Sequence, residues 1–228
     1  RREDKPVRRA KEIPYYRGPA GQPGLTVQIM TKEQLTSRLL NSETSMLYVP
    51  LHILADDPKL CQKLAARGRV AAVLPRIVHD ELPKLRNRLN QVRSLGIRDA
   101  LVGNLGLLLP AKEAGFRLRG DFGLNIFNSA SAQVARELKL ASATLSFEMT
   151  LPQIRDISKA VNMELIAYGR LPLMITENCI VYNHAGQHVC GDGLRLVDRK
   201  GARFPVVKAW GCRNEILNAK TLFLADKS

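Results

Sequence analysis

The chain has 228 residues, a net charge of +14 and four cysteines. A chain of this length buries one large core or two modest ones. It contains no apolar run of about eighteen residues, which excludes a membrane-spanning helix, and its charged N-terminus lacks the apolar stretch of a secretory signal. A protein of this size does not need disulfides to hold its core, so we expect a cytoplasmic protein with no membrane partner.

Positive charge is spread along the whole chain, with 35 Lys and Arg against 21 Asp and Glu. A basic surface attracts nucleic acid through counterion release, so RNA is one expected partner. The alternatives are a solvated surface or a face that docks on an acidic neighbouring domain, and few aromatic residues are available to stack bases. A homodimer is also compatible with the sequence.

Residues 1–23 are predicted to form a basic inter-domain linker. The segment contains seven Lys or Arg and four prolines, and it shows no apolar periodicity. We therefore expect the chain to be a piece of a longer protein, with other domains of that parent chain as partners.

From residue 24 onward, short apolar runs alternate with amphipathic stretches. The clearest helix has Leu82, Leu85, Leu89 and Val92 at helical spacing and ends at Gly96. The predicted strands are residues 25–30, 46–51, 69–75, 100–104, 117–125, 143–147 and 163–169. The predicted helices are residues 31–40, 57–67, 82–96, 108–113, 129–138 and 151–161.

About seven strand–helix units with short links are typical of an α/β fold, either a closed barrel or a doubly wound sheet. No Gly-x-Gly-x-x-Gly opens a helix after the first strand, so we favour a TIM-type (β/α)8 barrel over residues 24–170. Residues 171–228 no longer show this alternation and contain turn residues and short β runs instead. The pattern predicts a β-hairpin of residues 194–197 and 203–208, inserted after the seventh strand. A full barrel needs further strand–helix material after residue 226, so we expect it to be incomplete at its C-terminus.

Polar residues at the ends of the predicted strands are the candidate site, because a TIM barrel places function where strands meet the following loops. This set is His52, Arg76, His79, Asn104, Asn125, Asn128, Glu148, Arg170 and Glu177. Arginines there can bind a carboxylate or phosphate. Alternatively, several of these groups cap helices, above all Asn128 at the start of a predicted helix.

Two segments resemble peptidase family U32, the collagenase-like proteases. The first is Gly120-Asp-Phe-Gly-Leu-Asn-Ile-Phe-Asn-Ser129, followed by Ser146-Phe-Glu-Met-Thr150, and the second is Tyr168-Gly-Arg-Leu-Pro-Leu-Met-Ile-Thr-Glu-Asn-Cys179. The resemblance covers most of residues 24–226. Within the family, this region resembles the C-terminal barrel of the long, multi-domain members. The resemblance implies a modified TIM barrel. From the strand-end set we expect Asn125, Asn128, Glu148, Arg170 and Glu177 to be the substrate-binding residues.

Cys179, Cys190 and Cys212 flank a glycine-rich loop, and thiolates in such loops can converge on zinc or an iron–sulfur cluster. Their spacing is loose, so inert cysteines in a small β subdomain are the alternative. The resemblance implies a metal or [4Fe–4S] cluster bound by cysteines of this region. Because four ligands are needed, we expect His188 as the fourth, with His184 as an alternative. Cys61 is expected in the core.

Three functions follow from the resemblance. Some relatives resemble iron–sulfur-dependent hydroxylases of RNA bases or quinone precursors, which implies RNA modification. A second possibility is a metal-stabilised accessory barrel that positions RNA or another domain for a catalytic barrel. The third is a hydrolase that cleaves peptides, although neither Gly-x-Ser-x-Gly nor His-Glu-x-x-His is present. The catalytic residues are unknown from the sequence.

Overall fold

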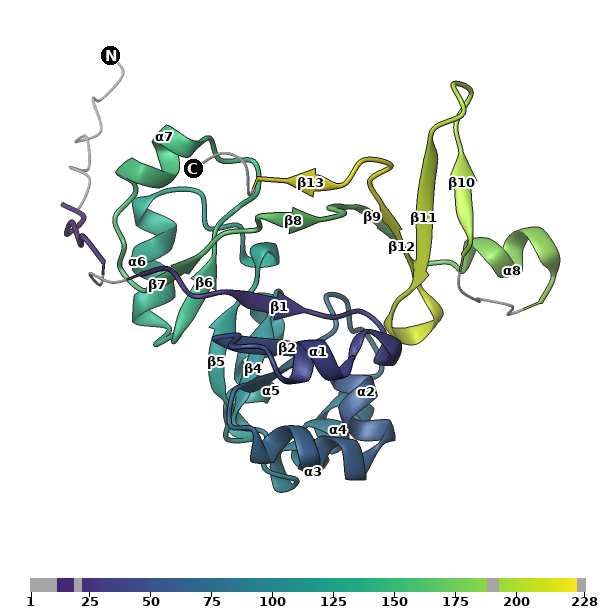
Figure 1. Cartoon of the computed structure of the whole chain (residues 1–228), viewed down its shortest axis with the longest axis horizontal. Helices are drawn as coiled ribbons and strands as arrows, with labels where there is room; N and C mark the ends of the chain where they lie inside the picture. Colours follow the sequence, from purple (N-terminus) through teal and green to yellow (C-terminus); the bar gives the residue numbers. More distant parts are fainter. Residues whose placement is uncertain (1–11, 19–21, 188–192, 225–228) are drawn as a thin grey trace, which may run out of the picture.

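The computed structural model describes residues 12–18, 22–187 and 193–224, and its centre is a parallel sheet that curls into a half-barrel (Figure 1). Seven strands pair in the order of the sequence, each with its predecessor. They are β1 (Thr26–Gln28), β2 (Met46–Pro50), β3 (Val70–Val73), β4 (Asp99–Val102), β5 (Arg117–Gly120), β6 (Ser142–Thr144) and β7 (Asn162–Glu164). This α/β architecture is compatible with the predicted incomplete barrel.

Helices connect successive strands and cover the outer face of the sheet. They are α1 (Ser37–Leu40), α2 (Leu51–Asp56), α3 (Pro58–Ala66), α4 (Leu82–Ser94), α5 (Leu108–Glu113), α6 (Ser129–Glu137) and α7 (Leu151–Asp156). Short 3-10 turns complete the loops as η1 (Lys32–Gln34), η2 (Leu105–Leu107) and η3 (Phe122–Leu124). Local chemistry fixes their starts, since Asp57 accepts the Leu60 amide and Pro58 occupies the first turn of α3.

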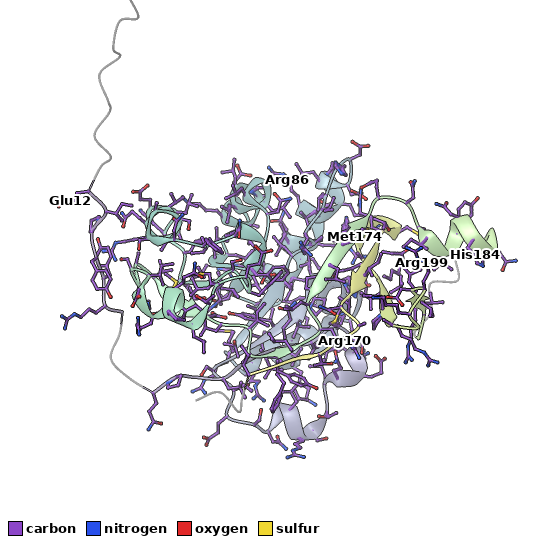
Figure 2. All side chains as sticks on the ribbon, turned by 90° about the horizontal axis from the view of Figure 1, so that it is seen from above. Glu12, Arg86, Arg170, Met174, His184 and Arg199 are labelled. Atoms are coloured by element: carbon purple, nitrogen blue, oxygen red, sulfur yellow. The ribbon has the colours of Figure 1, made fainter. Side chains whose placement is uncertain are left out.

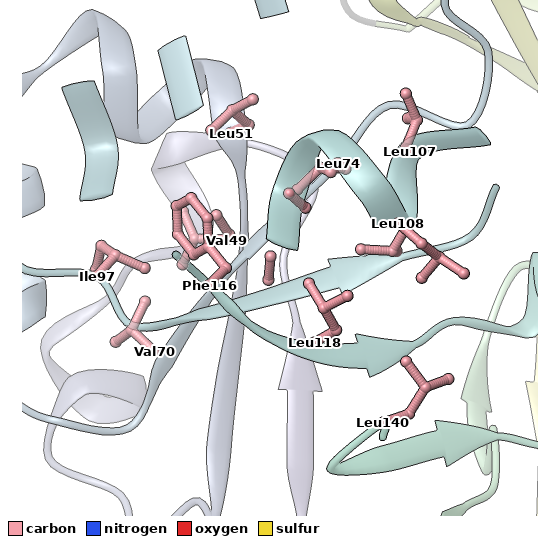
Figure 3. Packing of buried hydrophobic residues seen from close by; sticks show 14 of the residues in the cluster. Val49, Leu51, Val70, Leu74, Ile97, Leu107, Leu108, Phe116, Leu118 and Leu140 are labelled. Carbon is pink, nitrogen blue, oxygen red and sulfur yellow. The ribbon is translucent and has the colours of Figure 1, made fainter. Parts of the chain in front are cut away.

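Side chains alternate strictly along the strands. On β2, Leu47 and Val49 point to the helices and join the main core, whereas Met46 and Tyr48 point into the half-barrel. Figure 3 shows the outer layer, where strand residues such as Leu118 pack among helix and loop residues such as Leu108. The main hydrophobic core therefore lies between sheet and helices.

Two smaller antiparallel sheets follow the half-barrel. The first has the order β10-β11-β12-β9, with β9 (Pro172–Thr176), β10 (Arg195–Val197), β11 (Arg203–Lys208) and β12 (Asn214–Leu217). The second pairs β8 (Tyr168–Gly169) with β13 (Leu222–Phe223). Helix α8 (Ile180–Ala185) and the turn η4 (Trp210–Cys212) lie between these strands. The predicted hairpin strands pair as β10 and β11, whereas a cysteine-containing hairpin remains a prediction because Cys190 lies outside the described residues.

Part of the predicted linker rests on the half-barrel. The Tyr16 amide donates to Ser158 Oγ (2.9 Å), and the Lys159 amide donates to Tyr16 O (2.7 Å). The Arg136 guanidinium lies over the Tyr16 ring at 4.5 Å. Residues 14–16 thus join the loop between α7 and β7.

Several predicted elements are shorter than expected. The strand predicted at 117–125 ends at Gly120, because the Asp121 carboxylate accepts the Phe122 amide and begins a 3-10 turn. The strand predicted at 163–169 is divided, with β7 ending at Glu164 and β8 leaving to pair with β13. Helix α7 ends at Asp156, short of the predicted residue 161.

Candidate functional site

The carboxyl ends of β3, β4 and β5 bring polar groups together at one mouth of the half-barrel. Arg76 follows β3, and its Nη1 pairs with Glu215 Oε1 at 2.8 Å. Its guanidinium lies 4.9 Å from the centre of the Phe122 ring. Asn104, which follows β4, donates its amide to Arg76 O at 2.9 Å. Since Glu215 belongs to β12, the antiparallel sheet contributes directly to this mouth.

Asp121 is the buried acid of the mouth, with 6% of its surface exposed. Its pKa is raised to about 6, mainly by burial and to a smaller extent by the charges of Glu164 and Glu215, while the Phe122 amide and Arg76 act in the opposite direction. A carboxyl group that titrates near neutrality in a barrel mouth is suited to proton transfer.

The loops after β4 and β5 touch backbone to backbone beside Asp121. A side chain at Gly123 would place its Cβ 2.4 Å from Gly103 O, so only glycine fits there. Gly103 also lies against Asp121, since a Cβ at Gly103 would come within 3.4 Å of the Asp121 Cβ.

A charged network fills the half-barrel below the mouth. Asp99 accepts from Arg117 and Arg119 at 2.8–2.9 Å and is 2% exposed. Tyr48 donates its hydroxyl to Glu164 at 2.7 Å, and Arg119 lies 3.7 Å from the same carboxylate. Burial and the charge of Glu164 raise the pKa of the Tyr48 hydroxyl, which therefore stays a hydrogen-bond donor. The network links β2, β4, β5 and β7 across the interior.

Arg213 fixes the antiparallel sheet to the loop after β3. Its side chain, 5% exposed, makes two hydrogen bonds to Glu177 (2.8 and 2.6 Å) and one to Glu81 (3.2 Å). His79 Nε2 lies 3.5 Å from Glu177. The hydrogen bonds from Arg213 lower the pKa of Glu177, so this carboxylate is held ionised.

Cys179 and Cys212 lie at the same end of this sheet. Thr176 pairs with Asn214, so continuing the antiparallel register brings residues 178 and 212 opposite each other. The Ile180 amide donates to Asn214 Oδ1 at 2.7 Å, which ties the start of α8 to β12. Cys179 is buried, and its Sγ accepts the Tyr182 amide at 3.4 Å.

A strained backbone and an unsatisfied buried donor occur beside these cysteines. Cys212 has φ of 63°, a left-handed conformation that costs a non-glycine residue roughly 1–2 kcal/mol. Asn214 is 1% exposed, and its Nδ2 has no hydrogen-bond partner among the described residues. Thiolates and cluster sulfides accept such donors. Cys190 and His188 lie outside the described residues. Among the residues that the structure does describe, no three His, Cys, Asp or Glu side chains group as a metal site.

The predicted substrate-binding residues occupy different environments. Asn125 is exposed in a left-handed conformation at the end of η3, and Glu148 is exposed after β6. Asn128 accepts the Ser131 amide at 2.9 Å as the N-cap of α6. Arg170 donates to the carbonyls of Asn218 and Ala219. Of the predicted set, Glu177 takes part in the ion pairs around Arg213.

Sequence reasoning missed Asp121, Glu215 and the interior network. A usable signal existed in β4 and β5, where Asp99, Arg117 and Arg119 alternate with apolar or small residues at period two. Such alternation places charged side chains on one face of a strand. No local signal marks Glu215, because its partner Arg76 is 139 residues away.

The sequence model of peptidase family U32 matches residues 59–193, which include β3 to β9. No curated protein matches this chain. Among the described residues, no helix is long and apolar enough to cross a membrane.

Proposed function

This chain belongs to peptidase family U32, and from this premise we propose that it is a metal-binding barrel domain that acts on RNA. In this proposal Cys179, Cys190 and Cys212 hold zinc or a [4Fe–4S] cluster, with His188 as the fourth ligand. The pairing of β9 with β12 carries the proposal, because its register directs Cys179 and Cys212 to one end of the sheet. When bound, zinc supplies structural cross-linking, whereas a cluster supplies electron transfer.

The mouth of the half-barrel is the proposed substrate site. Arg76 offers a guanidinium for an anionic group, and Asp121 offers a carboxyl group that can give or take a proton near neutral pH. Phe122 and Phe147 lie 5.5 Å apart between ring centres, beside Arg76. Aromatic faces of this kind stack with nucleic-acid bases. The net charge of +14 supports RNA as the polyanionic partner.

Metal analysis of anaerobically purified protein tests the proposed centre. We expect zinc without sulfide, or iron with an equal amount of acid-labile sulfide in a brown protein. Cys212→Ser should release most of the metal, because it removes one thiolate ligand. The matched control is Cys61→Ala, which alters a thiol in the α3 core and should leave the metal content unchanged. Wild-type protein without metal, or Cys212→Ser with wild-type metal content, would contradict the proposal.

Peptide hydrolysis is a second candidate, supported by the description of the family and by the buried carboxyl group of Asp121. Incubation of the purified protein with unstructured peptides should then give new amino termini. Asp121→Asn should abolish this cleavage. Wild-type protein that leaves all peptides intact over a long incubation would reject the peptidase alternative.

A further inference from the structure

The hairpin of β10 and β11 carries a high density of positive charge. Residues 195–208 contain five Lys or Arg and one acid, Asp198. All five cations are exposed. The Asp198 carboxylate accepts the amides of Lys200 (2.8 Å) and Ala202 (2.9 Å), so it serves the turn.

Strand register places two of these cations, Arg195 and Arg203, on the same face of the hairpin. Arg195 pairs with Pro205 and Val197 with Arg203, so Arg195, Val197 and Arg203 share a face. Arg199 and Lys200 follow at the tip of the hairpin. Among the described residues, no carboxylate lies within ion-pair distance of any of the five cations.

The hairpin extends away from the half-barrel. Its strand β10 is the edge of the four-stranded sheet, and Figure 1 shows β10 and the adjoining part of β11 reaching beyond their neighbours. In Figure 2, Arg199 and His184 lie at the end of the molecule opposite Glu12. The hairpin begins at Arg195, after the residues matched by the family model. It is therefore an outward-reaching arm.

We propose that the β10–β11 hairpin is a contact arm for the phosphodiester backbone of nucleic acid. Exposed arginines without carboxylate partners bind phosphate oxygens and release counterions. A protein interface would instead need a desolvated apolar centre with aromatic anchors, whereas the arginine-bearing face carries Val197 and Pro205 between its cations, and Phe204 lies on the opposite face. The arm deepens the RNA part of the proposed function and does not depend on the metal centre.

Binding of a fluorescent single-stranded RNA to the full chain, measured as a function of salt, tests the arm. The variant Arg195→Gln, Arg199→Gln, Arg203→Gln removes three potential phosphate contacts. We expect the slope of log affinity against log salt to decrease by about 2, and affinity at about 0.1 M salt to fall roughly a hundredfold. A single-stranded DNA of the same length distinguishes the two kinds of nucleic acid. An equal loss of affinity for DNA and RNA in the hairpin variant would indicate contact with the backbone alone. A loss of affinity for RNA alone would assign the arm to RNA.

The matched control is Lys59→Gln, Lys63→Gln, Arg98→Gln, which removes three exposed charges from α3 and from the residue before β4. We expect it to keep nearly wild-type affinity. Equal losses of RNA affinity in the two variants would show that only net charge matters, and would overturn the proposed role of the hairpin. If the hairpin variant binds RNA with the affinity of the wild-type protein, the proposed role of the hairpin is also overturned, while RNA stays a partner. Protein that binds no RNA would reject both the arm and the RNA part of the proposed function. Circular dichroism checks that each variant is folded.

Discussion

The parallel and antiparallel sheets of this molecule are held by different interactions. Strands β2 to β6 send apolar side chains into a continuous core beneath the helices, with Leu47, Val49 and Val102 almost fully buried. In β9 to β12, the buried hydrophobic residues are Val206, Ile216 and Leu217. The antiparallel sheet is joined to the half-barrel by the ion pairs of Arg76 and Arg213. Added salt screens ion pairs but does not screen hydrophobic burial, so the two regions should respond differently to salt.

Leu89→Ala is expected to give the largest effect. Leu89 is fully buried on α4, so its truncation leaves a cavity in the main core. The free energy of unfolding should fall by about 2–5 kcal/mol, as measured by denaturant titration. Leu138→Ala, at a position that is 40% exposed, is the control and should change little. A small effect at Leu89 would mean that the core does not dominate the stability of the half-barrel.

Asp121→Asn tests the pH dependence of the mouth. The folded protein holds the Asp121 proton up to about pH 6, above the ordinary carboxyl value of 3.8. Its contribution to stability is complete below that ordinary value and is lost as pH rises through about 6. The wild type should therefore lose on the order of 3 kcal/mol between about pH 4 and pH 7 relative to Asp121→Asn. Glu148→Gln, at an exposed position, is the control, and parallel stability profiles for wild type and Asp121→Asn would reject the shift.

Arg213→Ala should loosen the antiparallel sheet without unfolding the half-barrel. It removes the side chain that joins Glu177 to Glu81. We expect hydrogen exchange in β9 and β12 to become roughly tenfold faster. Arg213→Lys should rescue the effect only partly, because lysine cannot make the two-pronged contact. Equal acceleration in β2 to β4 would show that the two regions unfold together.

The smallest expected effect is the coupling between Arg76 and Glu215. Both side chains are partly exposed, so a double-mutant cycle with Arg76→Gln and Glu215→Gln should give about 0.5–1 kcal/mol. The coupling should shrink in high salt, because screening weakens the ion pair. A salt-independent coupling would mean that packing of Arg76 on Phe122, rather than charge, carries the interaction.

The same contrast explains how far the sequence could be interpreted. Leu85, Leu89 and Val92 predict α4 because a helix buries residues at its own spacing, and α5 is confirmed at its predicted bounds. Helix α2 was missed because Leu51, Ile53 and Leu54 continue the apolar run of β2, which hides the change of period. In the antiparallel sheet, β9 and β12 pair across 38 residues between Thr176 and Asn214. Short, partly exposed strands with distant partners leave no periodic signal.

The candidate site follows the same rule. Arg76 and Asn104 were predicted at strand ends and lie at the mouth. Arg170 was expected beside them. The chain instead leaves the parallel sheet after Glu164, and Arg170 donates to the carbonyls of Asn218 and Ala219. Asp121 was overlooked because a predicted strand ran through it. The site lies at the ends of strands, and hydrophobic periodicity locates the ends of an element less precisely than its centre.

Because every strand of the parallel sheet pairs with its neighbour in sequence, most of the half-barrel can assemble through short-range contacts. The exceptions join its two margins. Tyr48 and Glu164 are 116 residues apart, and Tyr16 and Ser158 are 142 residues apart. Closing such long loops carries the largest entropic cost, so these contacts are expected to form last during folding. These two long-range contacts should also open first under mild denaturation, and a cysteine pair engineered between residues 16 and 158 would hold the second one closed.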